Sequence, residues 1–197
     1  MKPAIVIMGV SGCGKSTLGV ELAAALGVPF VEGDGLHPPA NVAKMRSGVP
    51  LDDRDREPFL RAVAEVLSEA GAAGVVVTCS ALKRKYRDLI RACAGEVVFV
   101  WPRADRAVIA ARLAQRREHY MPATLLDSQL ATLEPPAPDE HAIAIDGSAP
   151  TAAQVAAVLA ALRNAGAQTD GDASMNEPQC DIGLVGLAVM GENRSEE

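Results

Sequence analysis

Residues 9–16, with the sequence GVSGCGKS, constrain the fold of this chain more than any other feature, because they match the pattern G-x-x-x-x-G-K-[S/T]. An apolar run, residues 4–8, precedes the match, and leucines at helical spacing follow it in residues 17–26. This context predicts a phosphate-binding loop between a buried strand and a helix, whose glycines let backbone N–H groups point at a phosphate chain. A glycine turn that binds nothing is the alternative, and the two flanking elements argue against it.

The loop predicts ATP and Mg²⁺ as cofactors, because its lysine can reach the outer phosphates and its serine hydroxyl can bind the metal. Lys15 is therefore a predicted catalytic residue and Ser16 a predicted Mg²⁺ ligand. The predicted ATP-binding residues are Gly9, Val10, Ser11, Gly12, Cys13, Gly14, Lys15, Ser16 and Thr17.

Length and charge limit the classes of protein that the chain can belong to. With 197 residues and 49% hydrophobic residues, it has material for one well-packed domain and a short tail. A net charge of −6 argues against a nucleic-acid partner, which needs a basic face. The four cysteines form no C-x-x-C pair, and no apolar run approaches the roughly 20 residues of a membrane span. We therefore expect a reduced, cytoplasmic protein without membrane contact.

Apolar runs alternate with amphipathic segments along the chain, which predicts an α/β fold with a five-stranded parallel sheet and helices on both faces. The predicted strands are residues 4–8, 29–31, 75–79, 97–101 and 142–145. The predicted helices that join them include residues 83–94, 104–117 and 151–164. Residues 36–73 form a longer insert, with a helix start at Pro38–Pro39 and a second helix from about Glu57. In a P-loop fold, small kinases bind at this place the acceptor, which is the molecule that receives the phosphate. We therefore expect a P-loop kinase fold with an acceptor-binding insert.

Two acids follow the second predicted strand and are expected near Lys15, because ligands of parallel sheets bind beyond the carboxyl ends of the strands. Glu32 would hold Mg²⁺ through a water, and Asp34 would orient the proton of an acceptor hydroxyl. The alternative is that both acids only cap a turn, since Asp and Gly are common there.

Basic residues cluster in two further places, and each cluster has a functional and a plain interpretation. Residues 83–87, KRKYR, stand at a predicted helix start, where a bound anion would explain them and a solvated charged face would explain them equally well. Arg112, Arg116 and Arg117 end a later helix, and a closing lid could bring such an arginine to the transferred phosphate. Arg117 is the predicted catalytic arginine, and a surface helix end is the alternative.

Several blocks together resemble one family, the gluconokinases of the P-loop type, which are related in fold to shikimate and adenylate kinases. The resemblance covers residues 4 to about 163. Its blocks are the phosphate loop, GDGLHP at 33–38, KM at 44–45 with SGVPL at 47–51, Asp53 with Asp55, Arg56 and Pro58, CSALK at 79–83 with YRD at 86–88, and His119. The sequence departs from the family at two positions, with Glu32 where Asp is common and Phe59 where Trp is common.

The resemblance implies phosphorylation of D-gluconate to 6-phosphogluconate by ATP, with Asp34 holding the acceptor hydroxyl. It implies a substrate-binding set of Asp34, His37, Arg56, Ser80, Lys83 and Arg87. The sequence leaves open which of Arg56, Lys83 and Arg87 binds the gluconate carboxylate. It also leaves open whether the protein forms a homodimer. Another metabolite kinase, such as a shikimate-type kinase, and a non-catalytic nucleotide-binding regulator remain the alternatives.

The end of the chain differs from the kinase-like part in composition. Residues 1–165 form the predicted kinase domain, and residues 166–180 are predicted as a flexible linker. Residues 181–197 resemble the beginning of 6-phosphogluconate dehydrogenase, with glycines in the positions of a dinucleotide-binding turn. Because the helix and second strand of such a turn do not follow, we expect a truncated remnant that binds no cofactor.

Overall fold

A computed structural model describes residues 1–115 and 123–172 of the chain. Residues Met1–Leu162 form one compact unit, and Arg163–Glu197 form a second. The first unit contains a parallel sheet with the strand order β2-β3-β1-β4-β5. Its strands are β1 (Ala4–Ile7), β2 (Phe30–Val31), β3 (Val75–Thr78), β4 (Val98–Arg103) and β5 (Ile143–Asp146). The predicted five-stranded parallel α/β fold is confirmed.

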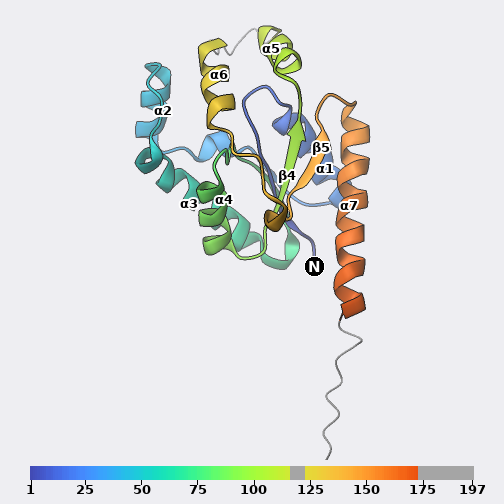
Figure 1. Ribbon diagram of the computed structural model, residues 1–197. Helices are drawn as coiled ribbons and strands as arrows, with labels where there is room; N and C mark the ends of the chain where they lie inside the picture. The colour runs from blue at the N-terminus through green and yellow to red at the C-terminus, as the bar shows by residue number, and fades with distance from the viewer. Residues whose placement is uncertain (116–122, 173–197) are drawn as a thin grey trace, which may run out of the picture. The chain divides into compact units, whose positions relative to one another are not determined.

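Helices cover both faces of this sheet, as Figure 1 shows. Strand residues alternate between the faces, so that Val6 packs toward α3 (Asp53–Ala70) and α4 (Arg84–Ala94). Ile5 and Ile7 pack on the opposite face, against Leu22 of α1 (Lys15–Leu26) and Val158 of α7 (Thr151–Asp172). The central strands are buried on both faces, which explains why they read as continuous apolar runs.

The insert between β2 and β3 contains α2 (Pro39–Arg46) and α3, and α3 begins one turn earlier than predicted. Asp52 caps the helix, because its carboxylate accepts from the Asp55 N–H at 2.9 Å and the Asp55 carboxylate accepts from the Asp52 N–H at 2.8 Å. The prediction placed the start at Glu57, next to Pro58, but Pro58 is the sixth residue of the helix, where it removes one backbone hydrogen bond without ending the helix. Lys44 of α2 forms an ion pair with Asp55, which joins the two helices of the insert.

Besides α3, two helices differ from their predicted bounds and a third was not predicted. The helix α6 (Ala123–Thr132) has no predicted counterpart, although Leu126, Leu130 and Leu133 recur at helical spacing and pack in one cluster. The helix α5 (Arg106–Ala114) has Gln115 as its C-cap, and residues 116–117 of the predicted helix lie outside the described residues. The helix α7 continues to Asp172, past the predicted end at residue 164, so residues 166–172 are helical. The division into kinase domain, linker and remnant stays a prediction, because residues 173–197 lie outside the described residues.

Within residues 1–115 and 123–172, no helix combines the length and the apolar character that crossing a membrane requires.

Candidate active site

The phosphate loop connects β1 to α1 and has the backbone that its glycines predict. Gly14 stands at the N-terminus of α1 with φ of +101°, a conformation that side-chain-bearing residues rarely adopt. The Lys15 ammonium donates to the carbonyl oxygens of Gly9 and Val10, each at 3.0 Å, and so lies over its own loop. Ser16 lies in the first turn of α1, at the positive end of the helix dipole. The loop therefore forms an anion site at a helix N-terminus.

Two distant segments contact the same loop, and no motif in the sequence indicates either contact. The Ser11 N–H donates to the side-chain Oε1 of Gln129 on α6 at 2.7 Å. The Arg112 guanidinium of α5 donates to the Cys13 carbonyl at 3.3 Å and to the Gly147 carbonyl at 2.8 Å. Arg112 thereby connects the phosphate loop with the turn after β5.

A cavity of about 550 Å³ lies beside the outer end of the phosphate loop. Its lining includes Gly12, Thr17, Arg112, Ser148, Thr151 and Gln154. Because it is continuous with the start of α1, this cavity is a space next to the loop where the base of a nucleotide can lie. Ser148 and Gln154 come from the β5–α7 turn and helix, which carry no motif, so their place beside the loop could not be predicted.

The turn after β2 brings Glu32 and Asp34 to the carboxyl end of the sheet, as predicted from their place after a strand. Gly33 is buried between the two acids, and a Cβ at this position would overlap the Thr78 carbonyl oxygen. The Thr78 hydroxyl accepts from the Gly33 N–H at 2.9 Å and donates to the Glu32 carboxylate. These contacts fix the turn, whereas no described residue donates a hydrogen bond to the exposed Asp34 carboxylate. The turn therefore has a structural part and a free carboxylate.

His37 lies at the end of the same turn and stacks on Phe59 of α3, with ring centroids 3.7 Å apart and an interplanar angle of 10°. Burial is the main cause that lowers the pKa of His37 below its usual 6.5; the Asp34 charge raises it and the Arg56 charge lowers it. The imidazole is thus neutral at pH 7. Its Nδ1 is buried and has no partner among the described residues. A buried, unpartnered ring nitrogen beside two charged groups is suited to a polar ligand.

Cys79 marks the point where the phosphate loop, the acidic turn and α3 converge. Burial raises the pKa of this thiol to about 12, and the charges of Lys15, Asp34 and Arg56 all act on it. The following residue, Ser80, accepts the Gly9 N–H with its carbonyl at 3.1 Å. Lys15, Asp34 and Arg56 are thus close enough to Cys79 to act on its thiol, Ser80 follows Cys79 in the chain, and Glu32 and His37 lie at the two ends of the turn that carries Asp34.

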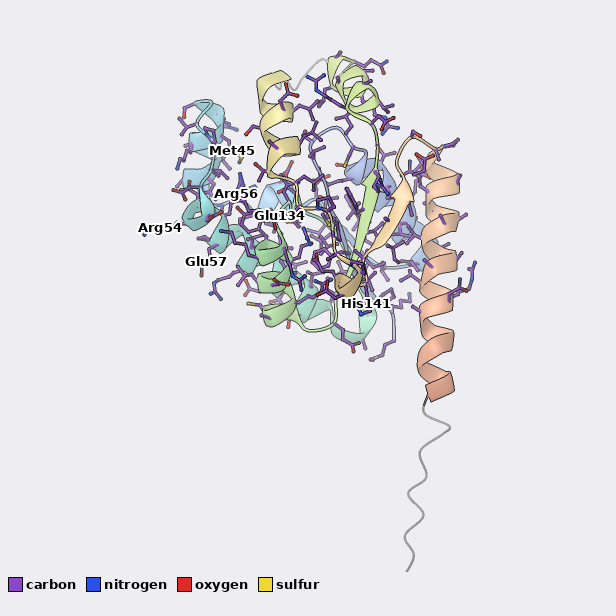
Figure 2. The ribbon with its side chains drawn as sticks, in the orientation of Figure 1. Met45, Arg54, Arg56, Glu57, Glu134 and His141 are labelled. Atoms are coloured by element: carbon purple, nitrogen blue, oxygen red, sulfur yellow. The ribbon has the colours of Figure 1, made fainter. Side chains whose placement is uncertain are left out.

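The three basic candidates for a carboxylate ligand lie in different environments. Arg56 is half-buried on α3 and lies 5.8 Å from the centroid of the Tyr86 ring, and no described residue accepts a hydrogen bond from its guanidinium. Figure 2 shows it on the inner side of the helix, with Arg54 on the outer side. Lys83 forms an ion pair with Asp53 at 3.3 Å. Lys85 and the Tyr86 hydroxyl contact the same Asp53 carboxylate, so Lys83 is one of three groups that share it.

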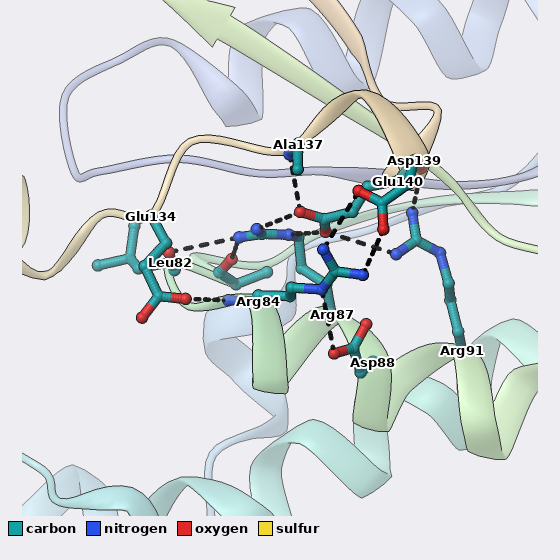
Figure 3. Close-up of polar contacts among 10 residues, drawn as sticks. Leu82, Arg84, Arg87, Asp88, Arg91, Glu134, Ala137, Asp139 and Glu140 are labelled. Carbon is teal, nitrogen blue, oxygen red and sulfur yellow. Dashed lines mark hydrogen bonds and ion pairs between the residues drawn. The ribbon is translucent and has the colours of Figure 1, made fainter.

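Arg87 is fully buried and lies in a network of hydrogen bonds within the protein, and its role in substrate binding stays a prediction. Its guanidinium donates to the Glu140 carboxylate at 2.5 and 2.8 Å, and to the carbonyls of Ala81 and Leu82 at 3.0 and 3.3 Å (Figure 3). The Arg87 ion pair is the main cause that lowers the pKa of Glu140 to about 2. All three nitrogen atoms of the Arg87 guanidinium therefore have hydrogen-bond partners within the protein, whereas Arg56 has none among the described residues. The predicted catalytic residue Arg117 lies outside the described residues, as does His119.

A divalent metal at this site would depend on the nucleotide for part of its ligands. The described residues contain no group of three or more His, Cys, Asp or Glu side chains that could hold an ion. Mg²⁺ in nucleotide sites usually binds one or two protein oxygens, phosphate oxygens and waters. The Ser16 hydroxyl at the loop and the Glu32 carboxylate beside it are oxygen donors of this kind, so the residues present fit Mg²⁺.

A parallel sheet with a phosphate loop after its first strand, a free carboxylate after its second and an acceptor insert defines a P-loop kinase. Comparison with known proteins agrees with this class. Residues 5–136 match the family model described as "AAA domain". The chain is 50% identical over 145 residues to the gluconokinase of Gluconobacter oxydans (strain 621H), covering 73% of this chain and 82% of that protein.

Two further relatives specify the family. The thermosensitive gluconokinase of Escherichia coli (strain K12) is 43% identical over 141 residues, which cover 70% of this chain and 75% of that protein. The crystal structure of a gluconokinase from Sinorhizobium meliloti 1021 superposes with a TM-score of 0.79 at 45% identity, covering 87% of this chain and 97% of that chain. The chain belongs to the gluconokinase family.

Proposed function

We propose that this protein transfers the terminal phosphate of ATP to a hydroxyl of D-gluconate, which gives ADP and 6-phosphogluconate. The observation that carries the proposal is the free Asp34 carboxylate, which lies with Lys15 and Arg56 around Cys79. A carboxylate in this position has the chemistry needed to accept the hydroxyl proton during phosphoryl transfer. Membership in a family whose relatives are gluconokinases supports gluconate as the acceptor.

On the nucleotide side, the N-terminus of α1 would bind the phosphates and the cavity beside Arg112 would bind the base. Lys15 would exchange its two loop carbonyls for phosphate oxygens, because charge-assisted hydrogen bonds are the stronger ones. Mg²⁺ bound to the nucleotide would neutralise phosphate charge. Ser16 would hold it directly, and Glu32, already oriented by Thr78, would hold it through a water.

On the acceptor side, Asp34 would orient the reacting hydroxyl and accept its proton. The half-buried guanidinium of Arg56 would bind the carboxylate of the sugar acid, since a planar fork of donors matches that group. Neutral His37 would bind a sugar hydroxyl through its unpartnered Nδ1. Ser80 and Lys83 are the proposed partners of the remaining hydroxyls. Arg117 remains the proposed lid arginine.

We assign the activity to the cytoplasm, because ATP is the phosphate donor. The two buried cysteines Cys13 and Cys79 are free thiols, which is compatible with a reducing compartment.

An ADP-release assay with purified protein tests the function. We expect turnover that requires gluconate, ATP and Mg²⁺, and that Lys15→Met removes while the thermal unfolding temperature is kept. Faster turnover with shikimate or a nucleoside monophosphate would identify a different metabolite kinase. ATP binding without acceptor-dependent ADP release would identify a non-catalytic regulator.

A further inference from the structure

The residues Ser80, Ala81 and Leu82, here called the acceptor loop, leave β3 in a conformation that needs support from elsewhere. Ala81 has φ of +40°, in the left-handed region that residues other than glycine rarely occupy. Such a conformation persists only where surrounding contacts impose it. The loop contains Ser80 and is followed directly by Lys83, and both residues are proposed gluconate contacts. Its backbone geometry therefore decides where those groups lie.

Every carbonyl of the acceptor loop accepts a hydrogen bond from another segment. The Ser80 carbonyl accepts from Gly9 of the phosphate loop at 3.1 Å. The Ala81 and Leu82 carbonyls accept from the same Nη1 atom of Arg87, at 3.0 and 3.3 Å. The Ala81 carbonyl receives no other hydrogen bond from a described residue, so Arg87 is its support on the strained side of the loop.

Arg87 is in turn fixed by a segment that follows α6, residues 134–140. Glu140 binds the Nε and Nη2 atoms of Arg87, and side-chain exposure is 0% for the arginine and 2% for the glutamate. The Glu134 N–H donates to the Leu82 carbonyl at 2.8 Å, and its carboxylate accepts from the Arg84 N–H at 2.6 Å. Figure 3 shows these contacts converging on the start of α4. A buried arginine whose three nitrogen atoms all have partners orients what it binds.

We infer that Arg87 is a positioning residue for the acceptor, which acts through the Glu140 ion pair and the two loop carbonyls rather than by binding gluconate. Removing it would let Ala81 relax and would move Ser80 and Lys83 away from the sugar acid. The part that concerns gluconate rests on the proposed function. The part that concerns the loop does not, because the contacts exist without substrate.

The test compares a double variant with a matched control. Arg87→Met alone would leave Glu140 buried without its partner and could unfold the protein, so Arg87→Met/Glu140→Leu removes both charges together. Arg91→Met is the control. Arg91 also reaches Glu140, donating to its carbonyl at 2.6 Å, but it makes no contact with Ala81 or Leu82.

Steady-state kinetics is the first measurement. We expect the double variant to raise the KM for gluconate on the order of tenfold, the effect of misplacing one hydrogen-bonding group, with the KM for ATP changed less than about twofold. Arg91→Met should leave both values near those of the wild type. A double variant with wild-type KM for gluconate would show that the pair serves folding alone and would overturn the inference.

Amide hydrogen exchange without substrate is the second measurement, and it separates failure of this inference from failure of the proposed function. Exchange in a peptide covering residues 79–87 should accelerate several-fold in the double variant, and exchange in residues 9–16 should stay as in the wild type. If Arg87 instead bound the gluconate carboxylate directly, its loss would raise the KM but leave the exchange of residues 79–87 unchanged. That result, like equal acceleration in Arg91→Met, would contradict positioning by Arg87.

Discussion

The proposed nucleotide half and the proposed acceptor half of the site are built in opposite ways. The phosphate loop is continuous in sequence, and its shape follows from its own glycines and from the helix that it begins. The acceptor half combines the turn after β2, one face of α3 and the loop after β3. Its loop depends on Glu134 and Glu140, which lie more than 50 residues further along the chain. Local sequence specifies the first half, and tertiary contacts specify the second.

This difference says where substitutions should act. A change in the phosphate loop affects nucleotide binding directly. A substitution in the acceptor half can remove a contact to gluconate, or it can disturb the contacts that position the loop after β3. The following predictions, ordered by the size of the expected effect, separate these routes.

Asp34→Asn should have the largest effect. An amide accepts no proton from the hydroxyl, so kcat with gluconate should fall about a thousandfold, or roughly 4 kcal/mol, while the Kd for ATP stays within twofold. The ADP-release assay and nucleotide titration measure the two quantities. Asp127→Asn, in an exposed ion pair with Arg106, is the control and should keep full activity. A loss below tenfold for Asp34→Asn would show that Asp34 is not the acceptor base.

The Arg87–Glu140 pair should dominate the acid sensitivity of the fold. The pKa of Glu140 is lowered to about 2 from an ordinary 4.5, so its contribution is complete above pH 4.5 and is lost as the pH falls toward 2. Glu140→Gln should cost about 3 kcal/mol at pH 7, because Arg87 stays buried without its counter-charge. Urea unfolding at pH 2–7 measures both effects.

The pH slope gives an internal check of this prediction. Near pH 3 the wild type should take up about one proton more on unfolding than Glu140→Gln does. Equal slopes for the two proteins would mean that Glu140 is not ionised in the folded state.

Arg56→Met should weaken gluconate binding without disturbing the fold. Loss of a charge-assisted contact to the carboxylate should raise the KM for gluconate about thirtyfold, or roughly 2 kcal/mol, and Arg56→Lys should recover part of it. Arg54→Met, on the exposed side of the same helix, is the matched control. Equal KM values for the Arg56 and Arg54 variants would remove Arg56 from the acceptor half.

Asp52→Ala should have the smallest effect. It removes the cap of α3 and should lower the free energy of unfolding by about 1 kcal/mol. Because α3 carries Arg56 and Phe59, the KM for gluconate should rise slightly, and the KM for ATP should not. Thermal unfolding and the same kinetic assay measure both. An unchanged unfolding temperature would show that the Asp52 cap contributes no stability.

The parts of the molecule that depend on local chemistry could be predicted from the sequence. The five strands, the phosphate loop and the acids after β2 follow from apolar runs, glycine spacing and position after a strand. The place of Arg87 could not be predicted, because in sequence it looks like the neighbouring exposed basic residues, and only Glu140 from a distant segment makes it structural. Gln129 and the cavity residues Ser148 and Gln154 could not be predicted either, because they belong to no motif and lie near the phosphate loop only in the folded protein. The helix α3 begins before the predicted Glu57 because Asp52 and Asp55 form a capping box at its start.

A crystal structure with gluconate and a non-hydrolysable ATP analogue tests the central claim most directly. We expect the gluconate carboxylate to bind Arg56 and the reacting hydroxyl to lie within hydrogen-bond distance of Asp34. We expect Arg87 to keep its hydrogen bonds to Glu140 and to the carbonyls of Ala81 and Leu82. A gluconate carboxylate bound by Arg87, with Glu140 released, would contradict the central claim.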